Sequence, residues 1–134
     1  MSRSGVRETV FKLVYETNVI GEVNELTVSS ATEKLNGDDK IYFDKVFYGI
    51  VENKSRLEDI IKQYARAYEF SRLYKVDIAI LFVAIYEILN FEDIPYKVSV
   101  NEAVELAKAY STEKSAGYIN GILASVIKNM ESLK

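Results

Sequence analysis

The chain has 134 residues, 49% of them hydrophobic, and a formal net charge of −3, so it can form one compact domain with a packed core. It contains no cysteine and no histidine, which excludes disulfides and removes the commonest general base and metal ligand. Its most apolar run, residues 78–89, is shorter than the roughly 20 residues of a membrane span, and residues 1–20 lack the core of a signal peptide. We therefore expect a cytoplasmic protein without a cofactor or a bound metal.

Basic residues gather near the two ends of the chain. Residues 1–15 carry three basic residues against one acidic residue, and residues 97–134 carry five against four. Residues 16–60 carry five basic residues against ten acidic ones. A protein that binds duplex nucleic acid is usually basic overall. Any nucleic-acid contact is therefore expected to be local and to lie near the ends of the chain.

Apolar residues recur at spacings of three and four along most of the sequence, which predicts helices. In chain order, we expect helices over residues 4–19, 26–35, 38–64, 76–89, about 99–110 and from 112–115 onward, with a joint at 65–71. Ser2 or Ser4 would cap the first helix and Gly21 would end it. Ser99 and Glu102 fit the capping-box pattern. No segment alternates as a strand does, so the predicted fold class is all-α.

The predicted architecture is a compact bundle of about seven helices, formed by two three-helix-like sub-bundles that share a core. Residues 1–134 would form a single domain, with an N-terminal half of about 1–66 and a C-terminal half of about 67–134. Gly49 is expected at a close helix crossing. Glycine is unfavourable inside a helix, so Asn120-Gly121 is interpreted as a close contact with the central helix, with Asn120 bonded to a buried group such as Glu87. The alternative is that this pair forms the floor of an RNA groove.

Several motifs, in this order, carry a resemblance to a known family. They are Arg7-Glu8 ahead of Leu13-Val14-Tyr15, Tyr42-Phe43 with Gly49-Ile50, Arg72-Leu73 with Val76-Asp77 and Ile85-Tyr86-Glu87, and the C-terminal segments 94–98, 100–108 and 118–123. Together they resemble the NusB family of bacterial transcription antitermination factors, which are small all-helical RNA-binding proteins. The resemblance spans almost the whole chain.

The resemblance implies binding of boxA-like single-stranded RNA in nascent ribosomal RNA transcripts. It would act together with NusE, a small-subunit ribosomal protein, and promote antitermination by RNA polymerase. Unpaired bases stack on aromatic side chains while basic residues hold the phosphates. The candidate RNA-binding residues are Arg3, Arg7, Lys12, Tyr15, Tyr96, Lys97, Lys114, Ser115 and Tyr118. The apolar pattern favours the core over a stacking role for Tyr15 and leaves the two roles about equal for Tyr118. The candidate residues for contact with NusE are Glu69, Arg72, Lys75 and Asp77.

The sequence departs from the family pattern at two places. The family opens with an arginine cluster, whereas this chain has Arg3 and Arg7, of which Arg7 is the best single RNA candidate. Phe82 stands where the family's central helix usually carries an arginine. Because phosphate contacts supply much of the affinity for nucleic acid, we expect weak RNA binding alone and a marked gain with NusE.

Two other classes of function stay open at this point. The acidic balance and the few arginines also suit a helical protein–protein interaction module or a homodimer with little RNA affinity. An enzyme is the poorest reading. The carboxylate pairs Asp38-Asp39, Glu58-Asp59 and Glu92-Asp93 are expected at helix ends or on polar faces, where they match the helix dipole or are solvated.

Overall fold

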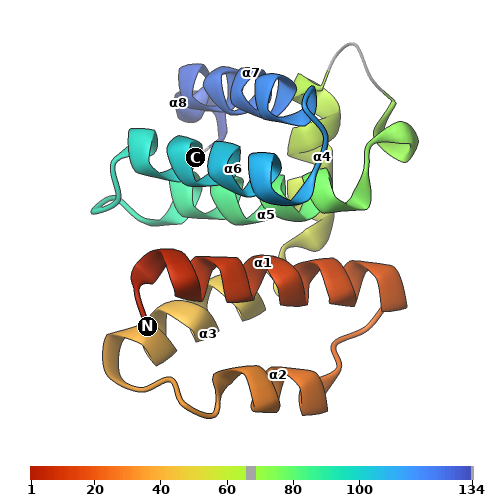
Figure 1. The fold of residues 1–134 in the computed structure, drawn as a ribbon. Coiled ribbons are helices and arrows are strands. Elements are labelled where there is room, and N and C mark those ends of the chain that lie inside the picture. The colour runs from red at the N-terminus through yellow and green to blue at the C-terminus, as the bar shows by residue number, and fades with distance from the viewer. Residues whose placement is uncertain (66–68, 134) are drawn as a thin grey trace.

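The computed structural model describes residues 1–65 and 69–133, and in these residues it is all-α (Figure 1). Eight α-helices and one short 3-10 helix, η1, are found there, without a strand. The helices are α1 (Arg3–Ile20), α2 (Glu25–Thr32), α3 (Gly37–Glu52), α4 (Lys54–Tyr64), η1 (Phe70–Arg72), α5 (Lys75–Asn90), α6 (Tyr96–Tyr110), α7 (Ser115–Lys128) and α8 (Met130–Leu133). The all-α prediction is confirmed, with more helices than the seven or so expected.

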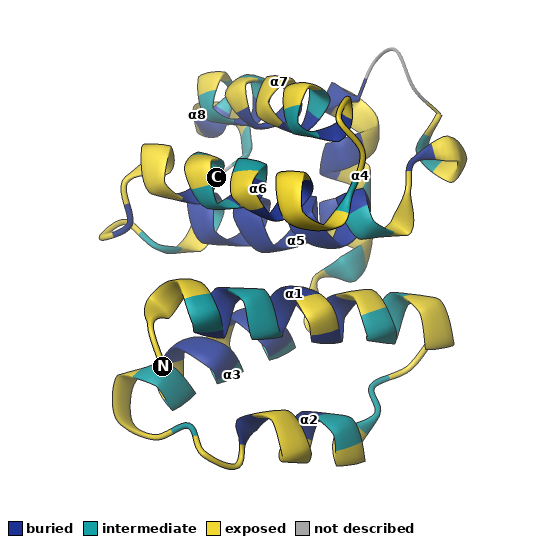
Figure 2. Ribbon diagram, viewed as in Figure 1, coloured by how far each residue is buried: buried dark blue, intermediate teal, exposed yellow. Residues whose placement is uncertain are grey.

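Helix α5 is the centre of the molecule. Every residue from 77 to 88 is buried, as the nearly continuous apolar sequence predicts. α1 and α3 pack against one side of α5, and α4, α6 and α7 pack against it from the other directions (Figure 2). Phe82, one of the departures from the family pattern, is fully buried in this core.

Helix α1 extends one residue beyond the predicted range 4–19 at each end, with the cap at Ser2 and the stop at Gly21 as predicted. The Ser2 hydroxyl accepts a hydrogen bond from the Gly5 amide at 3.0 Å and so caps the first turn. Gly21 follows the last turn with φ of 98°, a left-handed conformation that glycine adopts readily, and its amide donates to the Thr17 carbonyl. Asp38 and Asp39 lie in the first turn of α3, as the helix dipole favours.

The predicted long helix over residues 38–64 is wrong, because the chain breaks at Asn53 into α3 and α4. The Asn53 side-chain amide donates to the Gly49 carbonyl at 2.7 Å, and its backbone leaves helical geometry. The close crossing expected at Gly49 is present. A Cβ atom there would overlap the ring and hydroxyl of Tyr86 on α5.

The predicted capping box at Ser99 is also wrong. α6 starts three residues earlier, at Tyr96, directly after Pro95. Proline lacks an amide proton and has a fixed φ, so a helix can start beside it without losing a hydrogen bond. Ser99 and Glu102 then lie inside the helix and contact other elements.

The Asn120-Gly121 prediction needs correction as well. Both residues are exposed on α7, and nothing lies within 4 Å of a Cβ placed on Gly121. Glu87 is bonded by Arg7, Tyr42 and Ser99 instead. The helix-interior glycine therefore does not serve a close contact within this chain.

The division of the domain into two halves stays a prediction, since its boundary at 66/67 lies outside the described residues. α4 packs on α5 and α7 as well as on α3, so it contacts helices of the predicted C-terminal half. Across residues 1–65 and 69–133, no helix combines the length and apolar character needed to cross a membrane.

Candidate nucleic-acid interface

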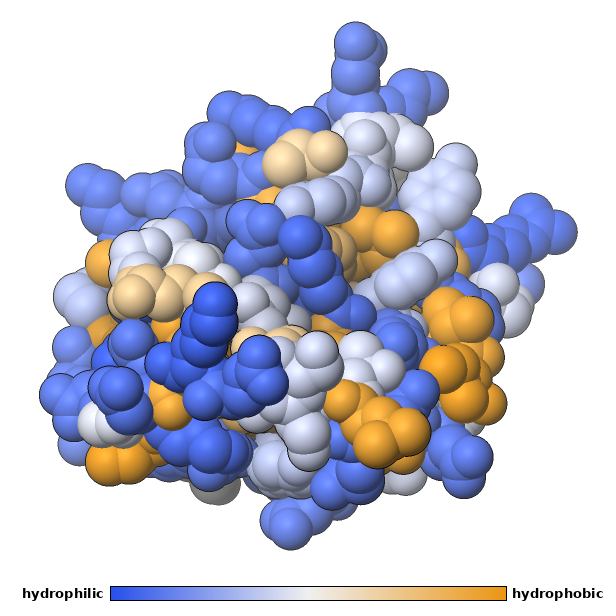
Figure 3. All heavy atoms as spheres, turned by 60° about the horizontal axis from the view of Figure 1, so that its bottom comes forward, coloured by the Kyte–Doolittle hydropathy of each residue, from blue (hydrophilic) through white to orange (hydrophobic). Residues whose placement is uncertain are grey.

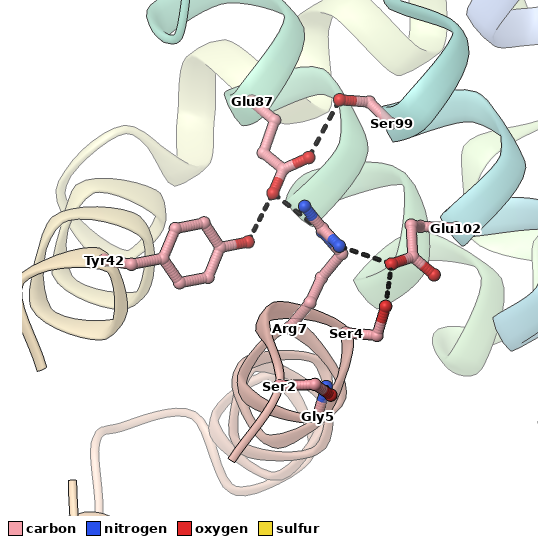
Figure 4. A network of polar contacts seen from close by, with 8 residues as sticks. All are labelled: Ser2, Ser4, Gly5, Arg7, Tyr42, Glu87, Ser99 and Glu102. Atoms are coloured by element: carbon pink, nitrogen blue, oxygen red, sulfur yellow. Dashed lines mark hydrogen bonds and ion pairs between the residues drawn. The ribbon is translucent and has the colours of Figure 1, made fainter. Parts of the chain in front are cut away.

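The best single RNA candidate, Arg7, lies inside the molecule (Figure 4). Its side chain leaves the first turns of α1 and is 4% exposed. The Arg7 Nε atom donates to Glu87 of α5 at 2.8 Å, and Nη1 donates to Glu102 of α6 at 2.5 Å. Tyr42 of α3 donates a further hydrogen bond to Glu87, and Ser99 of α6 donates another at 2.8 Å. One buried network thus joins four helices.

The electrostatics of this network favour the charged arginine. Burial alone would lower the pKa of Arg7, but Tyr42, Glu87 and Glu102 raise it above its ordinary value. Burial and the nearby Glu87 carboxylate raise the pKa of Tyr42 and keep its hydroxyl protonated. Ser4 adds a hydrogen bond to Glu102. Arg7 is therefore held as a structural cation, and its role in RNA contact stays a prediction.

Exposed aromatic side chains gather instead at the other end of α1, where α5 begins and α6 ends. A hollow of about 490 Å³ opens there, and we call it the tyrosine hollow. It is lined by Tyr15, Tyr74, Lys75, Val76, Tyr110, Ser111 and Thr112. The three tyrosines are 38%, 58% and 41% exposed in that order, so their rings are open to a ligand. The right-hand end of Figure 1 shows these three elements side by side.

A charged cluster borders the tyrosine hollow. The Tyr110 hydroxyl donates to Glu8 at 2.6 Å, and the Lys12 Nζ atom lies 3.2 Å from the same carboxylate. The hydrogen bond from Tyr110 and the contact with Lys12 lower the pKa of Glu8. Tyr110 and Glu8 in turn raise the pKa of Lys12. At neutral pH, the lysine is a cation whose charge is partly neutralised by Glu8.

Two further RNA candidates, Ser115 and Tyr118, bind a buried carboxylate. Asp77 in the first turn of α5 is fully buried. Ser111 donates to it at 2.6 Å, Ser115 donates at 2.8 Å, and Tyr118 donates a third hydrogen bond. These bonds fix the turn between α6 and α7 against α5, directly behind the tyrosine hollow. Asp77 was a candidate for contact with NusE, and in this structure its carboxylate does not face solvent.

The remaining RNA candidates lie in other places. Tyr96 and Lys97 are exposed at the start of α6, where Tyr96 borders a different hollow with Glu92 and Pro95. Arg3 is exposed at the start of α1, and its guanidinium carbon lies 4.3 Å from the centre of the Tyr42 ring.

The exposed Lys114 precedes α7. Of the candidates for contact with NusE, Glu69 precedes η1 and Arg72 is its last residue; both are exposed, with the Arg72 Nε atom 3.9 Å from the Glu69 carboxylate, and Lys75 lines the tyrosine hollow. The structure thus brings Tyr15 and Lys75 to one hollow, with Lys12 beside it, and separates them from Arg3, Tyr96 and Lys97.

Two of the three tyrosines that line the hollow were not among the candidates from the sequence. Tyr74 precedes α5 as its N-terminal flanking residue, and Tyr110 is the last residue of α6. Tyr110 follows the buried residues Ala103 and Leu106 at helical spacing, so the pattern alone assigns it to the core. A useful signal is its position at the helix end, where a large ring can contact the core with one edge. Its ring does so, with its centre 5.3 Å from that of Phe11.

Comparison with known sequences identifies the same family that the motifs of this chain resemble. The model of the NusB family matches residues 4–128. The transcription antitermination protein NusB of Acetivibrio thermocellus is 40% identical over 130 residues, which cover 96% of this chain and 90% of the relative. The protein of the same name from Natranaerobius thermophilus is 40% identical over 139 residues, with both chains covered completely.

Solved structures share the arrangement of helices. NusB of T. maritima superposes with a TM-score of 0.87 at 33% identity, covering 96% of this chain and 92% of the other. A NusB solved with NusE and double-stranded RNA superposes with a TM-score of 0.82 at 24% identity, covering 94% and 96%. At that lower identity, the likeness concerns the fold alone.

Proposed function

Because this chain belongs to the NusB family, we propose that it acts as a transcription antitermination factor. It binds boxA-like single-stranded RNA in nascent ribosomal RNA transcripts together with NusE, and it promotes antitermination by RNA polymerase. NusE enters this proposal from the family, one member of which has been solved together with NusE and RNA.

The observation that carries the RNA contact is the tyrosine hollow. Three tyrosines and one lysine line it, and a second lysine lies beside it. Proteins bind single-stranded RNA by stacking bases on aromatic rings and by holding the phosphates with basic residues. The hollow offers both, on a chain whose net charge does not favour nonspecific binding. Tyr15, Tyr74 and Tyr110 would stack bases, while Lys12 and Lys75 would contact phosphates.

The proposal also assigns a binding role rather than an enzymatic one. The sequence has no histidine or cysteine to act as a base or nucleophile. The two fully buried carboxylates, Asp77 and Glu87, are held by hydrogen bonds from neighbouring helices. They stabilise the fold in this account.

A titration with boxA-like RNA and a scrambled RNA, with and without NusE, tests the proposal. We expect selective but weak binding alone and a marked gain with NusE. Replacing a stacking ring costs about 1–3 kcal/mol per base, so Tyr74→Ala should weaken selective binding roughly tenfold. Tyr96→Ala is the matched control, since Tyr96 is an exposed tyrosine at the opposite end of α6. No selective binding in either condition would overturn the proposal. A loss of selective binding that is confined to the Tyr96 variant would place the RNA site at the start of α6 instead.

The second candidate function is a protein–protein module or homodimer. It is favoured by Leu26 and Ile41, which are 84% and 67% exposed in the acidic N-terminal part. Figure 3 shows the apolar side chains on this side of the molecule as separate groups among hydrophilic ones. Separate groups suit a continuous dimer interface less well than one broad apolar patch would. Self-association in sedimentation that is independent of RNA would support this second function.

A further inference from the structure

Two smaller hollows continue from the tyrosine hollow along α1. Lys75 lines both the tyrosine hollow and a second hollow of about 160 Å³, which α1, α4, η1 and α5 enclose. Asn18 and Lys54 line the second hollow and also a third, of about 170 Å³, beside the turn that follows α1. Because each hollow shares lining residues with the next, the three lie one after another along this side of α1. We call the second and third hollows together the α1 groove.

The chemistry of the second hollow suits a nucleotide. Phe70 is a half-buried ring, with the Lys62 Nζ atom 5.2 Å from its centre. The Asn18 amide and the Glu58 carboxylate supply hydrogen-bonding groups on opposite helices. Two lysines line this hollow, of which Lys75 also lines the tyrosine hollow and Lys54 also lines the third hollow.

We infer that single-stranded RNA held in the tyrosine hollow continues along the α1 groove, with Lys75 and Lys54 contacting its backbone and Phe70 contacting a base. This inference rests on the proposed RNA-binding function and adds a second subsite to it. The strand would pass from the end of α6 across the start of α5 to the start of α4.

The lining favours RNA over an inserted protein segment. The second hollow is small and shares Lys75 with the tyrosine hollow, which three exposed tyrosines line. Two lysines line it, and a repeating anionic backbone can contact both of them, whereas one charged side chain contacts a single lysine. Glu58 and the nearby Glu22 would repel phosphates between the lysines. Carboxylates instead accept hydrogen bonds from base amino groups, which adds selectivity.

A length series tests the inference. RNAs centred on the boxA-like element would be extended one nucleotide at a time from either end and titrated against the full chain. The variants are Lys54→Gln and the control Lys128→Gln, which removes an exposed lysine at the end of α7. We expect the unmodified chain to gain affinity as the RNA grows in one direction. Lys54→Gln should abolish that gain, leave the shortest RNA unaffected, and reduce the salt slope for the longer RNAs by about 0.7, the value for one phosphate contact.

Three results would overturn the inference: no gain with length, equal loss on short and long RNAs, or a loss by Lys54→Gln that is seen with NusE alone and not with RNA. The last result would identify the groove as a protein site. Lys75→Gln should weaken the binding of RNAs of every length, because Lys75 lines both the tyrosine hollow and the α1 groove. If the unmodified chain binds no RNA, the proposed function fails. If it binds RNA without dependence on Lys54, the second subsite alone fails.

Discussion

The Arg7 side chain connects the start of α1 to residues far along the sequence. Its guanidinium group lies between Glu87 and Glu102, and the Glu87 carboxylate also accepts hydrogen bonds from Tyr42 and Ser99. Removing one partner from a buried ion pair leaves an uncompensated charge, which is far worse than losing an exposed pair. Arg7 thus stabilises the packing of α1 on α5 and α6.

Replacement of Arg7 is expected to destabilise the fold. Arg7→Ala should lower the free energy of unfolding by about 3–5 kcal/mol, because Glu87 stays buried without its cation. Arg3→Ala serves as the control and should change it by less than about 1 kcal/mol, since Arg3 is exposed. Urea denaturation followed by circular dichroism measures both. An Arg7→Ala variant of full stability that has lost RNA binding would instead identify Arg7 as an RNA ligand.

At the same scale, Glu8 limits the charge available to RNA. Its carboxylate pairs with Lys12 and accepts from Tyr110 beside the tyrosine hollow. Glu8→Gln keeps a hydrogen-bond acceptor but frees the lysine charge. We expect boxA-like RNA to bind up to about fivefold more tightly, because an exposed ion pair contributes about 1 kcal/mol or less. Fluorescence anisotropy at low and high salt measures this gain, which should shrink as salt rises. Weaker binding by Glu8→Gln would mean that Glu8 itself contacts a base.

At the scale of the elements, helix existence was predictable and helix ends were less so. α5 follows from an apolar run without glycine or proline, and α1 follows from its serine cap and Gly21. The break at Asn53 depends on one side chain competing with the helix backbone, and such competition leaves a weak signal in the sequence. Ser99 satisfied a capping pattern, but Pro95 started the helix earlier. Local patterns are therefore informative until two of them compete.

Two glycines in helices should respond in opposite ways to substitution. Gly49→Ala should lower the free energy of unfolding by about 1–3 kcal/mol, because the added methyl group overlaps Tyr86 across the α3–α5 crossing. Gly121→Ala should raise it by roughly 0.5–1 kcal/mol, because its side-chain direction is open and alanine favours helix. Thermal unfolding of the two variants measures both signs. Destabilisation by Gly121→Ala would restore the view that this glycine permits a close contact within the chain.

At the scale of the whole molecule, folding brings Tyr15 of α1, Tyr74 just before α5 and Tyr110 at the end of α6 to one hollow. Their chain positions are far apart, and a single sequence carries no direct record of which distant residues meet. For the same reason the sequence identified Arg7 as important and did not identify its burial against Glu87. The resemblance to the family supplied the fold and the expected ligand, whereas the position of the candidate site required the structure.

The most direct test of the central claim is a two-dimensional NMR titration of the ¹⁵N-labelled chain with boxA-like RNA. We predict that the largest amide shifts fall in three segments, around Tyr15 in α1, around Tyr74 and Lys75 before and within the first turn of α5, and at the end of α6 near Tyr110. Shifts confined to the start of α6 around Tyr96 and Lys97, or no shifts that distinguish the boxA-like RNA from a scrambled one, would contradict the account.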